Sequence, residues 1–194
     1  DVDRLVRNDR IAWGSSMIAC NDADAMVTGN IRHYAASIEK LKKVVDPRPG
    51  EEIFGMTMIN AKGKTILVAD TNVQDFPSAQ RLVNVSKSCV RVARLFGFDP
   101  KVAFLSHSTF GNPISKNTKH VRDAIELLKK ENVDFDFDGE MQPDVALDPI
   151  YQETYPFSKI VGKANVLIMP ALHSAAISTK LMKVYGGAKL IGPL

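Results

Sequence analysis

The sequence has no long apolar run, no excess of one charge and only two cysteines in 194 residues. A membrane-spanning helix needs about 18 apolar residues, and the longest strongly apolar run here covers only 166–172. The 25 basic and 22 acidic residues leave a net charge of +3, which is too balanced to favour nucleic acid or an acidic membrane surface. We therefore expect no nucleic acid and no membrane among the partners.

Cys20 and Cys89 fit neither a metal-binding spacing nor a disulfide framework. Both lie in apolar surroundings, which predicts two buried thiols in a reducing compartment. The first residues, 1–4, have no signal-peptide character, so we expect a cytoplasmic protein. The sequence also contains no glycine-rich GxGxxG or GxxxxGK[ST] loop, so nucleotide binding by such loops is not predicted.

Apolar periodicity predicts alternating helices and short strands and shows no repeat, low-complexity segment or linker. Residues 11–20 fit either a strand or a buried helical turn. The other predicted elements are a helix at 31–45, a turn at 46–50, a hairpin of 54–59 with 65–69, helices at 77–96, 117–130 and 175–185, strands at 102–105, 135–137 and 165–169, a connector or short helix at 156–162, and a strand starting at 189. This alternation is typical of an α/β protein whose parallel or mixed sheet carries helices on both faces. A chain that stops as a strand begins is expected to be part of a longer polypeptide.

The rest of the chain is organised around the acidic stretch 135–147, which holds four carboxylates within nine residues, Asp136, Asp138, Glu140 and Asp144. The Asp138–Gly139 pair favours a turn that ends the strand. The acids from Asp138 onward are then expected at the carboxyl edge of the sheet, where α/β proteins bind ligands. The alternative is a solvated acidic loop.

Three segments change from apolar to polar where a predicted strand ends, 106–111, 138–144 and 170–180. If the strands are parallel, all three open on one edge of the sheet. Hydroxyls, backbone N–H groups and Lys180 would then line a cleft suited to phosphate or a phosphorylated cofactor. The alternatives are that the hydroxyls at 106–109 only cap and turn the chain, and that Lys180 is a solvated lysine.

Histidine and serine are adjacent at 106–107 and again at 173–174, but neither pair predicts a hydrolase. Neighbouring side chains of an extended segment point to opposite faces, so they do not pair as nucleophile and base. No Gly-x-Ser-x-Gly elbow is present either. His33 and His120 fall in helical patterns and are expected at the surface, and His107 and His173 are too isolated to predict a metal.

Several segments resemble the phosphate acetyltransferase/butyryltransferase family. The match covers nearly the whole chain, from about Arg10 to the end, and rests on the segments ADAMVTG (23–29), LSHSTFG (105–111), DGEMQPD (138–144), ANVLIMP (164–170) and IGPL (191–194). The family's Ser-Arg segment and catalytic Asp would follow the Gly-Pro at 192–193, so this chain is not expected to carry that chemistry.

Within this family the sequence is most similar to the C-terminal regulatory domain of bacterial NADP-dependent malic enzymes of the long, two-part type. The segments 24–29, 108–113 and 169–181 carry this closer likeness. The resemblance implies a parent protein that decarboxylates malate oxidatively to pyruvate with NADP and Mg²⁺ or Mn²⁺. Its acid–base pair and metal ligands would lie upstream, so the resemblance assigns no catalytic residue, no metal ligand and no cofactor to this chain.

The resemblance further implies that this chain binds acetyl-CoA, an acyl-CoA effector that inhibits the parent enzyme, and self-associates as a dimer or larger homo-oligomer. The implied fold is a three-layer α/β/α lobe with a mostly parallel sheet, one of two lobes with the ligand between them. Glu140 and Asp144 are expected to organise loops rather than to act as bases. The residues expected to line the cleft are Ser106, Ser108, Thr109, Gly111, Asp138, Glu140, Gln142, Asn165, His173, Ser174 and Lys180.

Two other readings of this resemblance remain open. One is a working phosphate acyltransferase that belongs to a longer chain, and the other is a purely structural oligomerisation domain. The first predicts that acetyl phosphate forms from acetyl-CoA, and the second predicts assembly that persists with no ligand bound.

Overall fold

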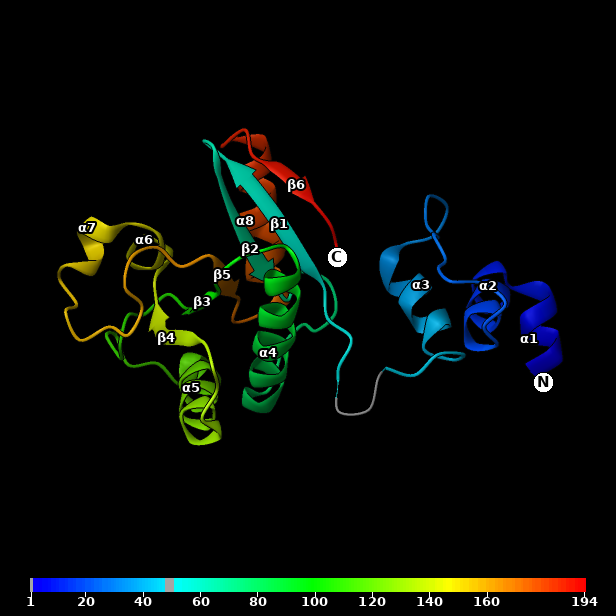
Figure 1. The fold of residues 1–194 in the computed structure, drawn as a ribbon, viewed down its shortest axis with the longest axis horizontal. Helices are drawn as coiled ribbons and strands as arrows, with labels where there is room; N and C mark the ends of the chain where they lie inside the picture. Colours follow the sequence, from blue (N-terminus) through cyan, green and yellow to red (C-terminus); the bar gives the residue numbers. More distant parts are fainter. Residues whose placement is uncertain (1, 48–50) are drawn as a thin grey trace. The chain divides into compact units, whose positions relative to one another are not determined.

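The computed structural model describes residues 2–47 and 51–194, which belong to two compact units, 1–51 and 52–194 (Figure 1). The boundary directly follows the turn predicted at 46–50, of which residues 48–50 lie outside the described part of the chain. The sequence showed no linker here, because the boundary falls beside a short segment that contains Pro and Gly and not beside a low-complexity stretch. Within the described ranges, no helix is both long and apolar enough to cross a membrane.

The first unit is helical in its described residues, with α1 at Val2–Asn8, α2 at Arg10–Ala19 and α3 at Tyr34–Leu41. Segment 11–20, which the sequence left open, is therefore a helix. Asp9 begins it, because its Oδ1 accepts hydrogen bonds from the backbone N–H groups of Ile11 at 3.0 Å and Ala12 at 3.3 Å. These bonds satisfy two of the donors that a helix leaves free at its start.

An ion pair connects the start of α2 to the segment before α3. Arg32 Nη1 donates a hydrogen bond to Asp9 Oδ2 at 2.6 Å and holds the pKa of that carboxyl below its ordinary value. The predicted helix at 31–45 is shorter than expected, since α3 covers only 34–41. Ile31, which the periodicity placed in the apolar stripe, is 84% exposed.

The second unit is built on a six-stranded sheet in the order β4-β3-β5-β2-β1-β6. The strands are β1 at Met56–Ala61, β2 at Lys64–Ala69, β3 at Lys101–Leu105, β4 at Asp136–Met141, β5 at Val166–Ile168 and β6 at Lys189–Ile191. The strands β4, β3, β5 and β2 pair in parallel, and β1 is antiparallel to both of its neighbours. The predicted hairpin of β1 and β2 is confirmed, with Lys62 and Gly63 at positive φ in its turn.

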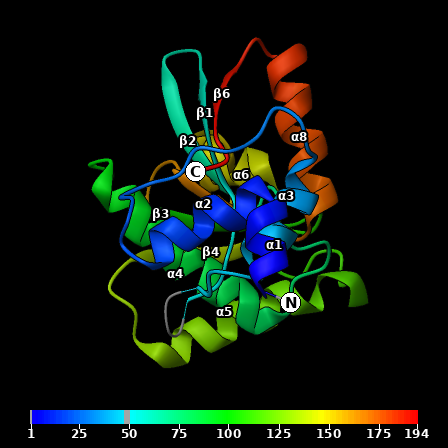
Figure 2. The same cartoon turned by 90° about the vertical axis from the view of Figure 1, so that its right-hand side faces the viewer.

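Helices cover both faces of this sheet (Figures 1 and 2). On one face α4 and α5 pack against side chains such as Leu67, Phe104 and Ile168. On the other face α6 and α8 pack against residues such as Leu105 and Leu167. The helices of this unit are α4 at Ala79–Leu95, the 3₁₀ turn η1 at Lys116–Thr118, α5 at Lys119–Glu131, α6 at Pro143–Leu147, α7 at Pro149–Gln152 and α8 at Leu172–Val184. The three-layer α/β/α prediction with a mostly parallel sheet is confirmed.

The boundaries around the acidic stretch differ from the prediction. Strand β4 does not end at Asp138–Gly139 but continues to Met141. Gly139 permits this because it lies directly against Phe104 of β3, where a side chain would find no room. The short helices α6 and α7 were not predicted; each begins with a proline, which is pre-organised for a first helical turn. Helix α8 begins at Leu172 rather than at 175.

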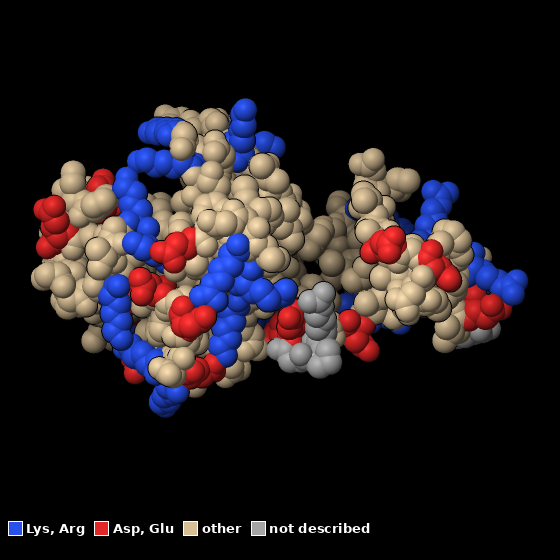
Figure 3. Space-filling view, viewed as in Figure 1, with Lys and Arg blue, Asp and Glu red and all other residues tan. Residues whose placement is uncertain are grey.

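Charges of both signs are interspersed on the surface that carries α4 and α5 (Figure 3). Lys87 pairs with Glu131, and Arg94 Nη1 lies 3.0 Å from Asp134 Oδ2. The hydrogen bond from Arg94 lowers the pKa of the Asp134 carboxyl. Exposed pairs of this kind contribute little to stability, so the buried contacts of the two helices determine how they pack.

The two cysteines are expected to differ sharply in reactivity. Cys89 is fully buried in α4, where burial raises the pKa of its thiol. The prediction that Cys20 is buried is wrong, because Cys20 follows the end of α2 and is exposed. Since the thiolate is the reactive form, iodoacetamide should modify Cys20 and leave Cys89 intact in the folded protein, as peptide mass spectrometry can show. Modification of both should require denaturant, and rapid labelling of native Cys89 would contradict this description of α4.

Candidate functional site

The three segments that change from apolar to polar meet at one edge of the sheet. This was the expectation for parallel strands, and the strands concerned are parallel. Segment 106–111 follows β3, segment 138–144 includes the end of β4, and segment 170–180 follows β5. These three strands are parallel neighbours in the sheet. The carboxyl edge of such a sheet is the usual place for a ligand site.

The loop after β3 is held in place by Glu140, whose side chain is only 1% exposed. Its Oε1 accepts hydrogen bonds from Ser108 Oγ at 3.0 Å and from the Gly111 backbone N–H at 2.9 Å. Arg122 Nη1 lies 3.4 Å from the same oxygen and compensates part of its charge. Glu140 therefore organises the loop, in agreement with the role expected for it.

Further bonds connect the same loop to the end of β4. The hydroxyl groups of Ser106 and Ser108 form a hydrogen bond with 3.1 Å between their oxygens. Thr109 Oγ1 accepts from the Gln142 backbone N–H at 3.1 Å, and Gln142 Nε2 donates to the His107 carbonyl at 2.8 Å. The polar side chains of the loop are thus used mainly to fix its own conformation.

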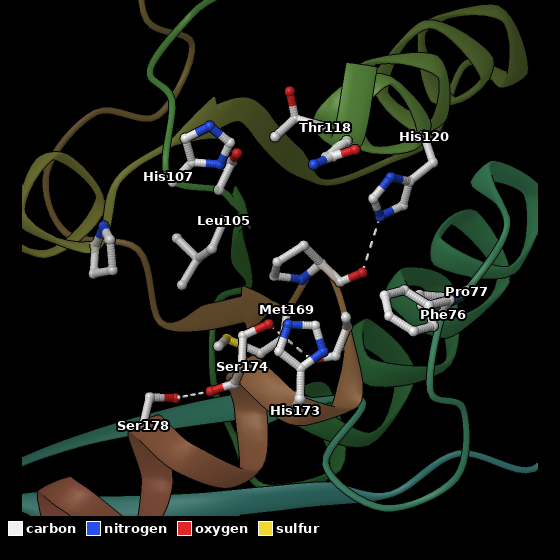
Figure 4. A pocket seen from close by; sticks show the side chains of 15 residues that line it. Phe76, Pro77, Leu105, His107, Thr118, His120, Met169, His173, Ser174 and Ser178 are labelled. Atoms are coloured by element: carbon white, nitrogen blue, oxygen red, sulfur yellow. Dashed lines mark hydrogen bonds between the residues drawn. The ribbon is translucent and has the colours of Figure 1, made fainter. Parts of the chain in front are cut away.

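Beside this loop lies a cavity of about 840 Å³. Its walls come from the carboxyl ends of the parallel strands and from the segments that follow them (Figure 4). The lining residues are Phe76, Pro77, Leu105, Ser106, His107, Asn117, Thr118, His120, Pro143, Met169, Pro170, Ala171, His173, Ser174 and Ser178. Most of this surface is apolar, with hydroxyls and imidazoles distributed around it.

Of the residues expected in the cleft, the structure brings Ser106, His173 and Ser174 to the cavity wall. Those that hold the loop instead are Ser108, Thr109, Gly111, Glu140 and Gln142. Asp138, Asn165 and Lys180 do not line the cavity. The expected set therefore divides into a lining group, a supporting group and a distant group.

The distant group has other contacts. Asp138 Oδ2 accepts from the Lys159 backbone N–H at 2.7 Å and so ties β4 to the segment between α7 and β5, where the connector 156–162 was predicted. Asn165 lies before β5, at the opposite edge of the sheet, where its Oδ1 accepts from the Lys101 backbone N–H at 2.8 Å. Lys180 is exposed in the middle of α8.

Sequence reasoning missed several lining residues. His120 was expected at the surface, but it is only half-exposed and its Nε2 lies 2.9 Å from the carbonyl oxygen of Pro170. Phe76 comes from the segment after β2, and its ring packs against that of His173 with centroids 5.6 Å apart. The signal that could have found Phe76 is the polar segment after β2, since β2 ends at the same edge as β3 and β5.

The structure also shows which chemistry this site does not arrange. Ser106 bonds to Ser108, and among the described residues no hydrogen bond joins a serine hydroxyl to a histidine ring. The described part of the chain contains no group of three or more His, Cys, Asp or Glu side chains that could hold a metal ion. What remains is a mainly apolar cavity with hydroxyl and imidazole groups, which is suited to binding an organic ligand.

The chain resembles known proteins over its whole length. A family model described as phosphate acetyl/butaryl transferase matches residues 1–194. An NADP-dependent malic enzyme of Rhizobium meliloti (strain 1021) is 44% identical over all of this chain, which spans 26% of that protein. A phosphate acetyltransferase of Bacillus subtilis (strain 168) is 29% identical over 96% of this chain and 58% of its own length.

A solved phosphotransacetylase from Streptococcus pyogenes has the same fold. Its TM-score is 0.86 at 30% identity, with 94% of this chain and 56% of that chain covered. This chain thus spans about a quarter of the malic enzyme and somewhat more than half of the phosphotransacetylases. The family model matches every residue and a solved member has the same fold, so the chain belongs to the phosphate acetyl/butaryl transferase family.

Proposed function

We propose that this chain is the C-terminal regulatory domain of an NADP-dependent malic enzyme and that it binds acetyl-CoA as an inhibitor in the cavity beside β3. The parent reaction would be the oxidative decarboxylation of malate to pyruvate with NADP and Mg²⁺ or Mn²⁺, catalysed by residues outside this chain. Similarity to malic enzymes over the full length of the chain supports the parent assignment. A cytoplasmic location is part of the same proposal.

The cavity is the observation that carries the ligand assignment. Ligand sites typically have volumes of about 300–1,000 Å³ and a mainly apolar lining with a few polar groups, and this cavity measures about 840 Å³. Phe76, Leu105 and Met169 offer apolar surface to an acyl-pantetheine chain. Ser174 Oγ donates to the Ala171 carbonyl at 3.0 Å and can still accept a hydrogen bond from one of the amide N–H groups of that chain. These residues fit an acyl-CoA, and acetyl-CoA is the member that the proposal names.

An active phosphate acyltransferase is the second candidate. The phosphate acetyltransferase of Bacillus subtilis and the phosphotransacetylase of Streptococcus pyogenes favour it, because this chain is similar to both. It predicts that acetyl-CoA and inorganic phosphate are converted to acetyl phosphate and CoA. Detection of acetyl phosphate, together with no malate-dependent reduction of NADP, would place this candidate first.

The decisive experiment uses the natural polypeptide that carries this chain. Malate-dependent reduction of NADP is measured while acetyl-CoA is titrated, and the proposal predicts that the rate falls. Replacing Ser174 by leucine puts a bulky side chain into the cavity wall. The concentration for half-inhibition should rise at least about tenfold, which corresponds to about 1.4 kcal/mol.

Lys180→Leu is the matched control, since Lys180 lies on the same helix, is exposed and does not line the cavity. It should leave inhibition unchanged. An equal loss in both variants would move the ligand away from the cavity, and an unaltered response in Ser174→Leu would remove the cavity from the proposal.

Self-association as a dimer or larger homo-oligomer is also proposed. Light scattering with and without acetyl-CoA distinguishes a regulated assembly from a purely structural one. A mass that is the same in both conditions, combined with no inhibition, would favour a structural oligomerisation domain.

A further inference from the structure

Three of the four histidines of the chain line one cavity. His107 comes from the loop after β3, His120 from the first turn of α5 and His173 from the first turn of α8. Figure 4 shows the three rings on different sides of the same space. The three histidines are far apart in the sequence, and the parallel strands bring the segments that carry them together.

Among the residues that the structure describes, no other ionisable side chain lines this cavity. Its described lining contains no Asp, Glu, Lys, Arg, Cys or Tyr. Helix α8, which is 13 residues long, begins at the cavity without a side-chain cap, so the positive end of its dipole also faces this space. The three imidazoles are therefore the groups of the described lining that can carry a charge.

The charged side chains of the surrounding elements lie outside the lining: Asp75, Lys116, Lys119, Arg122, Glu140, Asp144 and Lys180. Two of the basic groups already have partners. Lys119 Nζ lies 2.6 Å from Asp123 Oδ2, and Arg122 Nη2 donates to the Ser115 carbonyl at 2.9 Å. Imidazole is the side-chain type whose ordinary titration range includes neutral pH.

We propose that this cavity is a pH-responsive anion site, in which His107, His120 and His173 bind a phosphate-type group more tightly as the pH falls. The identification of that group as a phosphate of acetyl-CoA rests on the proposed function, but the anion site itself does not. In the cell, acidification would then strengthen the hold of the domain on its effector.

The direction in which the anion affinity changes with pH follows from the linkage between anion binding and proton binding. An anion binds better to imidazolium than to imidazole, so binding takes up protons wherever the rings are neutral beforehand. Each proton taken up makes the binding constant rise about tenfold for each unit by which the pH falls, as long as the pH is above the imidazole pKa. Phosphate esters lose charge in the same range, which opposes this effect, so the cleanest probe is sulfate, whose charge is constant there.

The test is titration calorimetry on the natural polypeptide with sulfate and, separately, with CoA, at about pH 8, 7 and 6. Repeating each titration in buffers of different ionisation enthalpy counts the protons taken up. The expected result is a sulfate affinity that rises about tenfold per linked proton between about pH 8 and 7. Net proton uptake should accompany it.

The variants His107→Gln and His173→Gln should each reduce the proton uptake and flatten the pH dependence. His33→Gln is the matched control, because His33 is the fourth histidine, lies in the first unit and does not line the cavity. It should behave as the wild type. In His120→Gln the side-chain amide can still donate to the Pro170 carbonyl, so this variant separates the local contact from the charge.

The outcomes separate the two proposals. Sulfate binding that does not change with pH, or that keeps its proton uptake in the three cavity variants, would overturn the anion site. CoA that binds with equal affinity to the wild type and to the His107→Gln and His173→Gln variants would place its phosphate outside the anion site, while the sulfate results decide on the site itself. No CoA binding at any pH, with pH-dependent sulfate binding intact, would overturn acetyl-CoA as the effector and retain the anion site.

Discussion

Replacing Gly139 by alanine is expected to lower the free energy of unfolding by about 2–6 kcal/mol. Gly139 has a φ of +144°, a region that residues with a Cβ rarely adopt. A Cβ there would lie 2.6 Å from the carbonyl oxygen of Phe104, which is itself fully buried. Because β3 is held between β4 and β5, its backbone has little freedom to move aside, and the backbone strain at Gly139 adds to the steric overlap.

Urea unfolding followed by circular dichroism measures this loss. Gly63→Ala is the matched control, because Gly63 also has a positive φ, +71°, but a Cβ at that position has no atom within 4 Å. Its expected cost is about 1–2 kcal/mol. Equal unfolding midpoints for the two variants would show that the close approach of β3 and β4 does not constrain the fold. Since domains are stable by only about 5–15 kcal/mol, Gly139→Ala should remove a substantial share of the stability of the chain.

Replacing Glu140 by alanine is expected to cost about 3 kcal/mol and to abolish ligand binding in the cavity. The change removes the acceptor shared by Ser108 Oγ, the Gly111 N–H and Arg122 Nη1. Ser108 is fully buried, so its hydroxyl loses a partner that water cannot replace. The loop that contributes Ser106 and His107 to the cavity wall would then lose its fixed position.

Glu140→Gln separates the hydrogen bonds from the charge. Glutamine keeps an acceptor oxygen at the same place but removes the charge that Arg122 compensates. We expect this variant to retain most of the stability and measurable CoA affinity by calorimetry. If alanine at this position were as stable as glutamine and bound CoA equally well, the role of Glu140 in holding the loop would be refuted.

The elements with a strong local signal were predictable. Helix α4 follows from an apolar stripe that includes Leu82, Val85 and Cys89, and Ser78 caps it by accepting from the Arg81 backbone N–H at 3.2 Å. The hairpin of β1 and β2 follows from two apolar runs around a short polar turn. Each of these signals is contained in neighbouring residues, so the chain needs no tertiary context to express it.

Predictions failed where burial depends on distant residues. The Asp138–Gly139 pair has the local character of a turn, yet β4 passes through it because Phe104 of β3 requires a residue without a side chain there. Cys20 lies in an apolar stretch but follows the last turn of α2, where the chain turns polar and the thiol is exposed. Local composition could not distinguish these cases.

The candidate site shows the same division. The sequence alone indicated that polar segments come at the ends of the strands β3, β4 and β5, and that they would meet at one edge if the strands were parallel. Only the tertiary structure decided that Glu140 is turned inward to hold a loop, that Asn165 lies at the opposite edge, and that three histidines from separate segments surround one cavity. The reason is physical: the order of residues along a strand sets the edge that each one reaches, whereas packing against other elements sets which side chains are buried as supports and which remain open to a ligand.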